Sequence, residues 1–195
     1  LMTGDNLIAV LLLYVIISLF WIVGFHGKNL LSPLIESFYR PLLYINMAAF
    51  NAGMRGNDIP YIFNTAMFQM FADIGGSGAT LGLVIYILLF SKRHDNRMIA
   101  NISLFPSLMN INETVIFGMP IVFNPLLDIP FILAPLVTLT VGYFLIRVGF
   151  CPPVVIEVPW VMPPILYGFL VTGGNIYGAI SHFICICGSL LVYAP

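Results

Sequence analysis

An acidic residue inside a strongly apolar part of the sequence is the clearest candidate for chemistry. Glu113 lies in the stretch Ile-Asn-Glu-Thr-Val-Ile-Phe-Gly, with apolar segments on both sides. A carboxylate withdrawn from water is costly without partners, and ionisable residues at membrane depth are most often functional. The amides of Asn110 and Asn112 can supply those partners or bind a ligand themselves. We expect Glu113 to bind a polar ligand; the alternative is a carboxylate that caps a helix from Val115 onward.

His26 is a second candidate, because it ends a long apolar run and directly precedes a glycine. An imidazole can exchange hydrogen bonds with a hydroxyl group or take part in proton transfer. The same position also suits an interfacial histidine that simply terminates a helix. The residue type and its place leave both roles open.

A glycine-rich turn, Gly75 to Thr80, separates two short apolar segments. Backbone N–H groups in such a turn can bind anions or hydroxyl groups, and we expect Gly76, Ser77 and Gly78 to contact a ligand. Tight packing is the alternative use of these glycines. No lysine follows them, so the turn is not a P-loop. Asp73, just before the turn, is a further candidate ligand at membrane depth.

Trp160 is the aromatic residue that we expect to stack on the apolar face of a ligand such as a sugar ring. Pro159, Pro163 and Pro164 restrict the backbone around it, beside a Gly-Gly turn. Most other aromatic residues of the chain are expected to face lipid or to lie in the interfacial belt. The sequence has no credible catalytic triad or zinc-binding spacing.

Composition excludes an ordinary soluble protein and indicates lipid as the main solvent. Hydrophobic residues make up 60% of the chain and charged residues 8%, against about 25% charged residues in soluble domains. The net charge of -1 provides no basic field for nucleic acid. Cys151, Cys185 and Cys187 lack the spacing of a redox or metal motif. We therefore expect no metal, no cofactor and no nucleic-acid partner.

The hydrophobic pattern predicts an all-α polytopic membrane protein whose helices are repeatedly interrupted. Three full spans are expected, among them residues 7–25 and 129–148. Pairs of half-length apolar segments around a polar turn are typical of re-entrant helical hairpins. Two such pairs are residues 59–73 with 81–90, and 98–109 with 115–123, and a Gly-Gly break separates 160–171 from 176–193. Such breaks are costly at membrane depth unless they line a binding cavity, which favours a transporter.

The polarity of the remaining segments predicts a short helix, an apolar segment and two loops. Residues 32–40 are expected to form a short interfacial helix with an ion pair between Glu36 and Arg40, four residues apart. Residues 41–50 are apolar but too short to span, and 51–58 read as a loop. Residues 91–97 hold three of the seven basic residues, so we expect a cytoplasmic loop there.

Four stretches together resemble a known family, the membrane IIC component of the lactose/cellobiose/diacetylchitobiose class of bacterial sugar phosphotransferase permeases. The stretches are residues 24–29, 75–82, 111–125 and 159–174, of which the third, Ile-Asn-Glu-Thr-Val-Ile-Phe-Gly-Met-Pro-Ile-Val-Phe-Asn-Pro, is the most specific. The similarity extends over residues 1–195, but only to the C-terminal half of the family's protein. This half is expected to be the sugar-binding transport domain. The N-terminal half, which supplies much of the family's dimer contact, is then missing.

The resemblance implies a multi-pass protein of the bacterial inner membrane that binds a β-linked disaccharide in a cavity built from re-entrant hairpins. The domain moves like an elevator, and a phosphocysteine on the partner IIB protein phosphorylates the sugar at its 6-hydroxyl. The family's glutamate and histidine fall on Glu113 and His26, which would contact the sugar near that hydroxyl. Glu113 is then a candidate general base. Thr114 replaces the proline usual after the glutamate, and we expect altered hairpin geometry rather than lost binding.

The implied partners are the disaccharide, phosphorylated IIB, membrane lipid and a second copy of the permease in a homodimer. Two other functions remain open. In a proton-coupled secondary sugar transporter, Glu113 and His26 would form a proton relay and the sugar would leave unmodified. A non-transporting membrane subunit or sensor would bind no sugar, and it leaves the repeated glycine-rich breaks unexplained.

Overall fold

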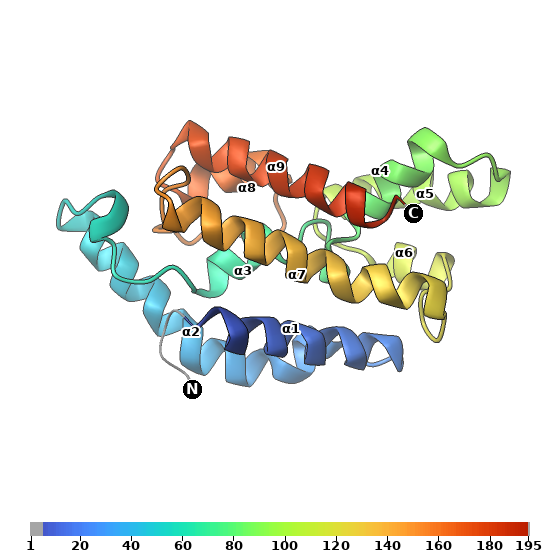
Figure 1. The fold of residues 1–195 in the computed structure, drawn as a ribbon, viewed down its shortest axis with the longest axis horizontal. Coiled ribbons are helices and arrows are strands. Elements are labelled where there is room, and N and C mark those ends of the chain that lie inside the picture. Colours follow the sequence, from blue (N-terminus) through green and yellow to red (C-terminus); the bar gives the residue numbers. More distant parts are fainter. Residues whose placement is uncertain (1–5, 195) are drawn as a thin grey trace.

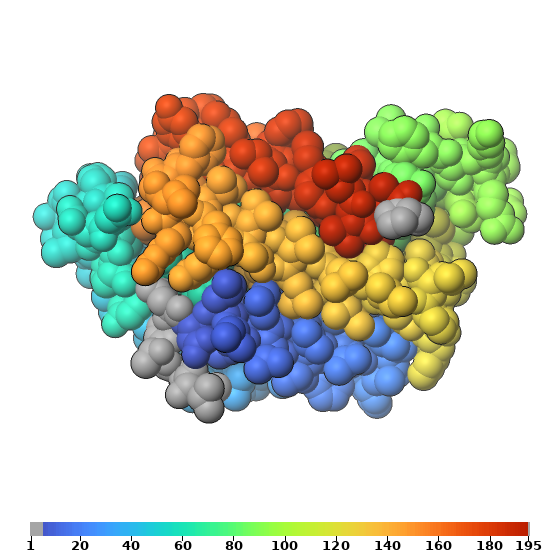
Figure 2. Space-filling model, in the orientation of Figure 1, coloured from blue at the N-terminus to red at the C-terminus, as the bar shows by residue number. Residues whose placement is uncertain are grey.

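The computed structural model describes residues 6–194, which form helices and turns without a strand. The elements are α1 (Leu7–Ile22), α2 (Gly27–Asn51), η1 (Gly56–Asp58), α3 (Thr65–Phe71), η2 (Ser77–Ala79), α4 (Leu81–Phe90), α5 (His94–Leu108), α6 (Glu113–Gly118), α7 (Pro125–Arg147), α8 (Pro164–Val171) and α9 (Ile176–Val192). The long helices α1, α7 and α9 lie side by side, with α2 against α1 (Figure 1). The α4–α5 pair projects at one end of the molecule (Figure 2). This arrangement confirms the predicted all-α class.

Among the described helices, only α7 is both long and apolar enough to cross a bilayer. The sequence predicted three full spans, and the helix expected over residues 7–25 is shorter. Helix α1 has 16 residues because the chain turns at Gly24, whose φ is +87°. The N–H of Gly24 donates to the carbonyl of Trp21 and the N–H of Phe25 to that of Phe20. This pattern is a Schellman motif, which satisfies the last carbonyls of a helix and ends it.

Helix α2 is continuous over 25 residues, where the sequence predicted a short helix over 32–40, a separate apolar segment and a loop from residue 51. Pro33 and Pro41, at which the sequence predicted boundaries, lie inside this helix. Each proline removes one N–H donor. The hydroxyl of Ser32 donates to the carbonyl of Asn29, the acceptor that the missing N–H of Pro33 leaves without a partner. The predicted ion pair between Glu36 and Arg40 is present within this helix.

Both predicted interruptions of the helices are found at the predicted places. The chain leaves α3 and enters α4 through the glycine-rich turn and η2, and it leaves α5 and enters α6 through residues 109–112. Helix α5 begins at His94, so the loop predicted over 91–97 is limited to residues 91–93. Helix α6 has only six residues, and it ends before the expected apolar segment over 115–123 does.

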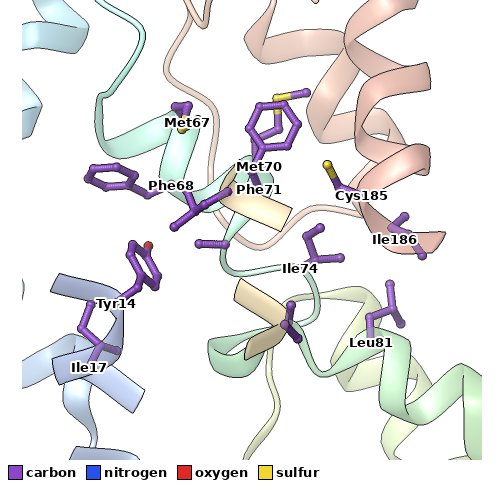
Figure 3. Close-up of a cluster of buried hydrophobic side chains, with 14 of the residues drawn as sticks. Tyr14, Ile17, Met67, Phe68, Met70, Phe71, Ile74, Leu81, Cys185 and Ile186 are labelled. Atoms are coloured by element: carbon purple, nitrogen blue, oxygen red, sulfur yellow. The ribbon is translucent and has the colours of Figure 1, made fainter. Parts of the chain in front are cut away.

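The short helix α3 lies in the interior of the molecule. The side chains from Ala66 to Phe71 are all buried, so α3 has no exposed face along that stretch. Its Phe68 and Phe71 belong to a cluster that also includes Tyr14 of α1, Ile74 and side chains of α9 (Figure 3). Burial on all sides of a seven-residue helix fixes the position of the turn that follows it.

Side chains of α7 and α9 hold the glycine-rich turn in place. A Cβ atom on Gly78, whose φ is +78°, would lie 2.3 Å from the ring of Phe131. The carbonyl of Gly78 accepts a hydrogen bond from the hydroxyl of Tyr193 at 2.7 Å, and that of Ala79 accepts one from the hydroxyl of Ser189 at 2.6 Å. Backbone groups that leave the helices at this depth thus find side-chain partners.

A buried ion pair joins α1, α2 and the end of α3. The ammonium of Lys28 lies 2.7 Å from Oδ2 of Asp73 and donates to Oε1 of Gln69 at 2.8 Å. The hydroxyl of Tyr14 donates to the same Asp73 oxygen at 3.3 Å. Asp73 is 2% exposed, whereas the side chain of Lys28 is 33% exposed. The lysine therefore neutralises a carboxylate that has almost no access to water.

Replacing Gly78 by alanine should destabilise the protein, because the added methyl group requires both a strained φ and displacement of the Phe131 ring. We expect the free energy of unfolding to fall by roughly 1–3 kcal/mol, measured by thermal or denaturant unfolding in detergent. Gly188→Ala is the matched control, since a Cβ there meets nothing within 4 Å. Equal stability of the two variants would contradict this packing role.

Replacing Lys28 by methionine should destabilise the protein more than replacing Asp73 by asparagine. The first change leaves a buried carboxylate without its cation, at a cost of roughly 3 kcal/mol, whereas the second leaves a lysine with partial access to water and with Gln69 as partner. The free energies of unfolding of the two single variants and of the double variant give the interaction energy between Lys28 and Asp73. Lys92→Met, in an exposed loop, is the control. A larger loss of stability in Asp73→Asn than in Lys28→Met would contradict the role of Lys28 as the cation that neutralises Asp73.

Candidate functional site

A cavity of about 650 Å³ lies between α1, α2, α3 and the two interrupted hairpins. This volume is within the range of about 300–1,000 Å³ typical of small-molecule sites. Polar and charged side chains from distant parts of the chain line it: His26, Lys28, Glu36, Arg40, Gln69, Asp73, Asn110, Asn112, Glu113 and Glu157. Tyr14, Trp160 and Tyr167 add aromatic surface. A polar chamber of this kind in a chain with 8% charged residues is a candidate ligand site.

The structure brings together nearly all of the residues that the sequence predicted for the site. His26, Asp73, Gly76, Ser77, Asn110, Asn112, Glu113 and Trp160 line the cavity. Gly78 does not, because it packs against Phe131 and its carbonyl is bound by Tyr193. Tight packing, the alternative considered for these glycines, therefore describes Gly78 better than ligand contact.

His26 and Glu113 face each other across the cavity lining. Nε2 of His26 lies 4.0 Å from Oε1 of Glu113. Nδ1 of His26 accepts a hydrogen bond from the backbone N–H of Asn29 at 3.2 Å and thereby caps α2. A neutral imidazole that accepts through Nδ1 carries its proton on Nε2, the nitrogen nearer to Glu113. The imidazole also packs against Trp21, with 4.3 Å between the ring centroids.

The Glu113 carboxylate is less withdrawn from water than the sequence suggested. Its side chain is 48% exposed, and that of His26 is 36% exposed. Glu113 is the first residue of α6, a helix too short to cover it, and it borders the open cavity. A carboxylate at a helix N-terminus interacts favourably with the helix dipole, so the capping alternative and a ligand role coexist here. Helix α6 starts at Glu113 with Thr114 as its second residue.

Asn110 and Asn112 hold the two interruptions against each other. Oδ1 of Asn110, which has a φ of +59°, accepts from the N–H of Gly75 at 2.9 Å, and its Nδ2 donates to the carbonyl of Trp160 at 2.7 Å. Nδ2 of Asn112 donates to the carbonyl of Ser77 at 2.6 Å. These amides therefore bind backbone groups while they line the cavity, so part of their hydrogen-bonding capacity is already used.

Close packing at the same place explains one glycine of the turn. A Cβ atom on Gly76 would lie 2.5 Å from Cγ of Asn112, and the φ of Gly76 is +97°. Only glycine combines this backbone conformation with such a close approach. The contact brings the glycine-rich turn and the α5–α6 turn into one wall of the cavity.

Lys28, Gln69, Arg40 and the contact with Glu157 were not expected in the cavity from the sequence, although the Glu36–Arg40 ion pair itself was predicted. Lys28 binds Gln69 and the buried Asp73. The guanidinium of Arg40 binds Glu36 in the same helix and Glu157 in the connection between α7 and α8. Lys28 stands two residues after His26 in the Gly-Phe-His-Gly-Lys-Asn stretch, which was a usable signal. Arg40 and Glu157 are 117 residues apart, so no short stretch of the sequence indicates that they are in contact.

Within residues 6–194, no group of three or more His, Cys, Asp or Glu side chains is arranged to hold a metal ion. The side chains that line the cavity bring together several kinds of polar group. These are a carboxylate and an imidazole close together, a neutralised buried carboxylate and amides, beside an aromatic ring. Such groups bind and orient a molecule rich in hydroxyl groups, and they can accept or donate a proton.

Comparison with known proteins places the chain in a family. Residues 1–135 match the family described as "Phosphotransferase system, EIIC". The chain is 41% identical to the lichenan permease IIC component of Bacillus subtilis, over 91% of this chain and 39% of that protein. It is 34% identical to the cellobiose-specific EIIC component of Lactococcus lactis, over 98% of this chain and 42% of that protein.

A solved structure has the same fold. The transporter ChbC, the IIC component of the N,N'-diacetylchitobiose-specific phosphotransferase system, superposes with a TM-score of 0.93 at 34% identity, covering 97% of this chain and 44% of that one. The chain thus spans less than half the length of these relatives. An all-α membrane protein, it belongs to the EIIC family of the phosphotransferase system.

Proposed function

We propose that residues 1–195 form the C-terminal sugar-binding transport domain of a IIC permease, a multi-pass protein of the bacterial inner membrane. The ligand is a β-linked disaccharide of the cellobiose, diacetylchitobiose or lactose type. The observation that carries the proposal is the polar cavity in which His26, Glu113 and Trp160 meet. Membership of the EIIC family supports it.

Each part of the cavity suits one part of a disaccharide. Trp160 is 54% exposed, and its ring suits stacking against the apolar side of a sugar. Glu113 and the Nε2–H of His26 supply an acceptor and a donor for one hydroxyl group. The wall formed by Asp73, Gly76 and Ser77 offers further polar groups. Hydroxyl groups bound in this way exchange water for protein partners of similar strength.

The proposed reaction is phosphorylation of the bound sugar at its 6-hydroxyl. The 6-oxygen attacks phosphorus of the phosphocysteine on IIB, the S–P bond breaks, an O–P bond forms, and a thiolate remains on IIB. Glu113 accepts the hydroxyl proton as general base. A half-exposed carboxylate can pass that proton to water, which restores it for the next cycle. The transport domain moves like an elevator to present the sugar to IIB on the cytoplasmic side.

Lipid and a second permease copy complete the proposed assembly. Large apolar side chains are exposed on several helices, among them Leu126, Ile102 and Leu191. Exposed apolar surface of this kind suits contact with lipid tails. Homodimerisation would use the N-terminal half of the family's protein, so the experiments below use the full-length permease.

A proton-coupled secondary transporter is the second candidate. The observation in its favour is the 4.0 Å separation of Nε2 of His26 and Oε1 of Glu113, which suits a proton relay. Vesicles loaded with IIB and the phosphotransfer proteins distinguish the two. Phosphosugar that appears only with phosphoenolpyruvate supports the IIC permease, and free sugar driven by a pH gradient supports the alternative. Absence of saturable sugar binding would instead favour a subunit or sensor.

Sugar binding itself is tested by a thermal-shift screen of the purified permease with cellobiose, diacetylchitobiose and lactose. Because a ligand that binds only the folded state raises its stability by mass action, the true ligand at about 100 times its Kd should stabilise the protein by about 2.7 kcal/mol. Maltose, an α-linked disaccharide, is the control. Equal shifts with α- and β-linked sugars would contradict the proposed substrate class.

Replacing Glu113 by glutamine should lower the rate of sugar phosphorylation by about 100-fold or more, because the amide cannot accept the hydroxyl proton. Sugar affinity should fall less, since glutamine still accepts a hydrogen bond. Phosphorylation is measured with purified IIB and phosphoenolpyruvate, and affinity by calorimetry. Asp95→Asn, an exposed acid in the first turn of α5, is the control. Undiminished phosphorylation in Glu113→Gln would remove Glu113 from this role.

A further inference from the structure

Acidic residues are concentrated in the cavity. Four of the eight acidic residues of the chain line it, against two of the seven basic ones. The carboxylates are Glu36, Asp73, Glu113 and Glu157, and the cations are Lys28 and Arg40. With the imidazole of His26 neutral, the lining therefore carries an excess of two negative charges.

Both cations already have anionic partners. Lys28 binds Asp73 at 2.7 Å and Gln69 at 2.8 Å. The Nε and Nη1 groups of Arg40 donate to Glu36 and Glu157, respectively. Phosphate sites in proteins rely on arginine or lysine groups that are free to bind the phosphate oxygens. Lys28 and Arg40 are both already bound to carboxylates and are therefore not available to a phosphate group.

One of the four carboxylates of the lining has an oxygen without a hydrogen-bond partner in the described part of the chain. Oδ1 of Asp73 is buried and has no hydrogen-bond partner among the described residues, although the same residue lines the cavity. A buried oxygen of this kind attracts hydrogen-bond donors and repels other anions. The unpartnered oxygen belongs to one of the four carboxylates already counted, and it favours the same class of ligand, a neutral molecule with hydroxyl groups.

We propose that the negative charge of the lining makes the cavity selective for uncharged sugars and causes it to reject the 6-phosphates of the same sugars. The inference rests on the proposed function and extends it to product release. Phosphoryl transfer adds about −1.5 to −2 charges to a neutral ligand at neutral pH. The product is then held in a lining of like charge, where Coulomb repulsion is stronger than in water.

This charge selectivity gives phosphorylation a direct effect on affinity. A neutral disaccharide enters the cavity without electrostatic cost, whereas its phosphorylated form is repelled by the carboxylates around it. Glu36 and Glu157 determine this selectivity through Arg40, because they occupy the cation that would otherwise attract the phosphate. No separate conformational signal is needed for the affinity to fall after transfer.

The experiment compares two ligands on the full-length permease in lipid nanodiscs. Calorimetry gives the Kd of the disaccharide that binds and the Kd of its 6′-phosphate. The selectivity is the Kd of the 6′-phosphate divided by the Kd of the disaccharide. We expect the phosphate to bind at least about tenfold more weakly at low salt. In Glu36→Gln/Glu157→Gln, which removes two negative charges and frees Arg40, the ratio should approach one.

Two controls separate charge from shape. Glu36→Asp/Glu157→Asp keeps both charges and should keep the selectivity, and Asp58→Asn/Asp95→Asn removes two exposed acids outside the cavity lining and should not change it. Raising the salt concentration from about 50 to about 500 mM should also reduce the ratio in the unmodified protein, because salt screens charges that water can reach. This measurement remains informative if the glutamine variant does not fold.

The outcomes distinguish the two proposals. If no disaccharide binds, the proposed function fails, and the charge selectivity fails with it. If a disaccharide binds and its 6′-phosphate binds equally well, only the charge selectivity is overturned. A ratio that changes neither with salt nor in the glutamine variant would also overturn it, because the phosphate would then be excluded by shape. A lower ratio in both cases supports the proposal.

Discussion

Backbone N–H and C=O groups that leave the helices inside this apolar molecule need partners other than water, and side-chain amides and hydroxyls supply them. Asn110 binds the N–H of Gly75 and the carbonyl of Trp160, and Tyr193 binds the carbonyl of Gly78. Asn46 does the same at another turn, where its amide binds both the N–H and the carbonyl of Tyr61. Interrupted helices are stable at membrane depth only on this condition. The fold therefore depends on a few polar side chains rather than on helix length.

The cavity follows from the same constraint. Where two helices stop, the polar groups that join their turns need polar partners, and several of these partners line the cavity. The resulting chamber contains side-chain amides that already bind some backbone groups. It also contains charged groups that are paired with each other, such as Lys28 with Asp73. Contacts with Phe131 of α7, Ser189 of α9 and Tyr193 give the glycine-rich turn beside these groups a fixed position. Binding residues held in this way lose little conformational freedom when a ligand arrives.

The sequence predicted the features that have a local cause. The glycine-rich turn and the Asn-Ile-Asn-Glu stretch marked both interruptions, and the residues chosen there line the cavity, with Gly78 as the exception. The continuity of α2 was missed, because a side-chain hydroxyl compensates for a proline that composition alone marks as a boundary. Glu157 was missed for another reason: its partner lies 117 residues away, and only the packed fold brings the two together. The exposure of Glu113 likewise depends on how much of it the short α6 covers.

The start of α2 gives His26 two tasks at once. Its Nδ1 accepts the hydrogen bond that caps the helix, while Nε2 points towards the carboxylate across the cavity. The two ring nitrogens therefore serve different partners, and the cap fixes which of them faces the cavity. A ligand that accepts a hydrogen bond from Nε2 leaves the start of the 25-residue helix α2 intact, because the nitrogen that holds the helix takes no part in that contact.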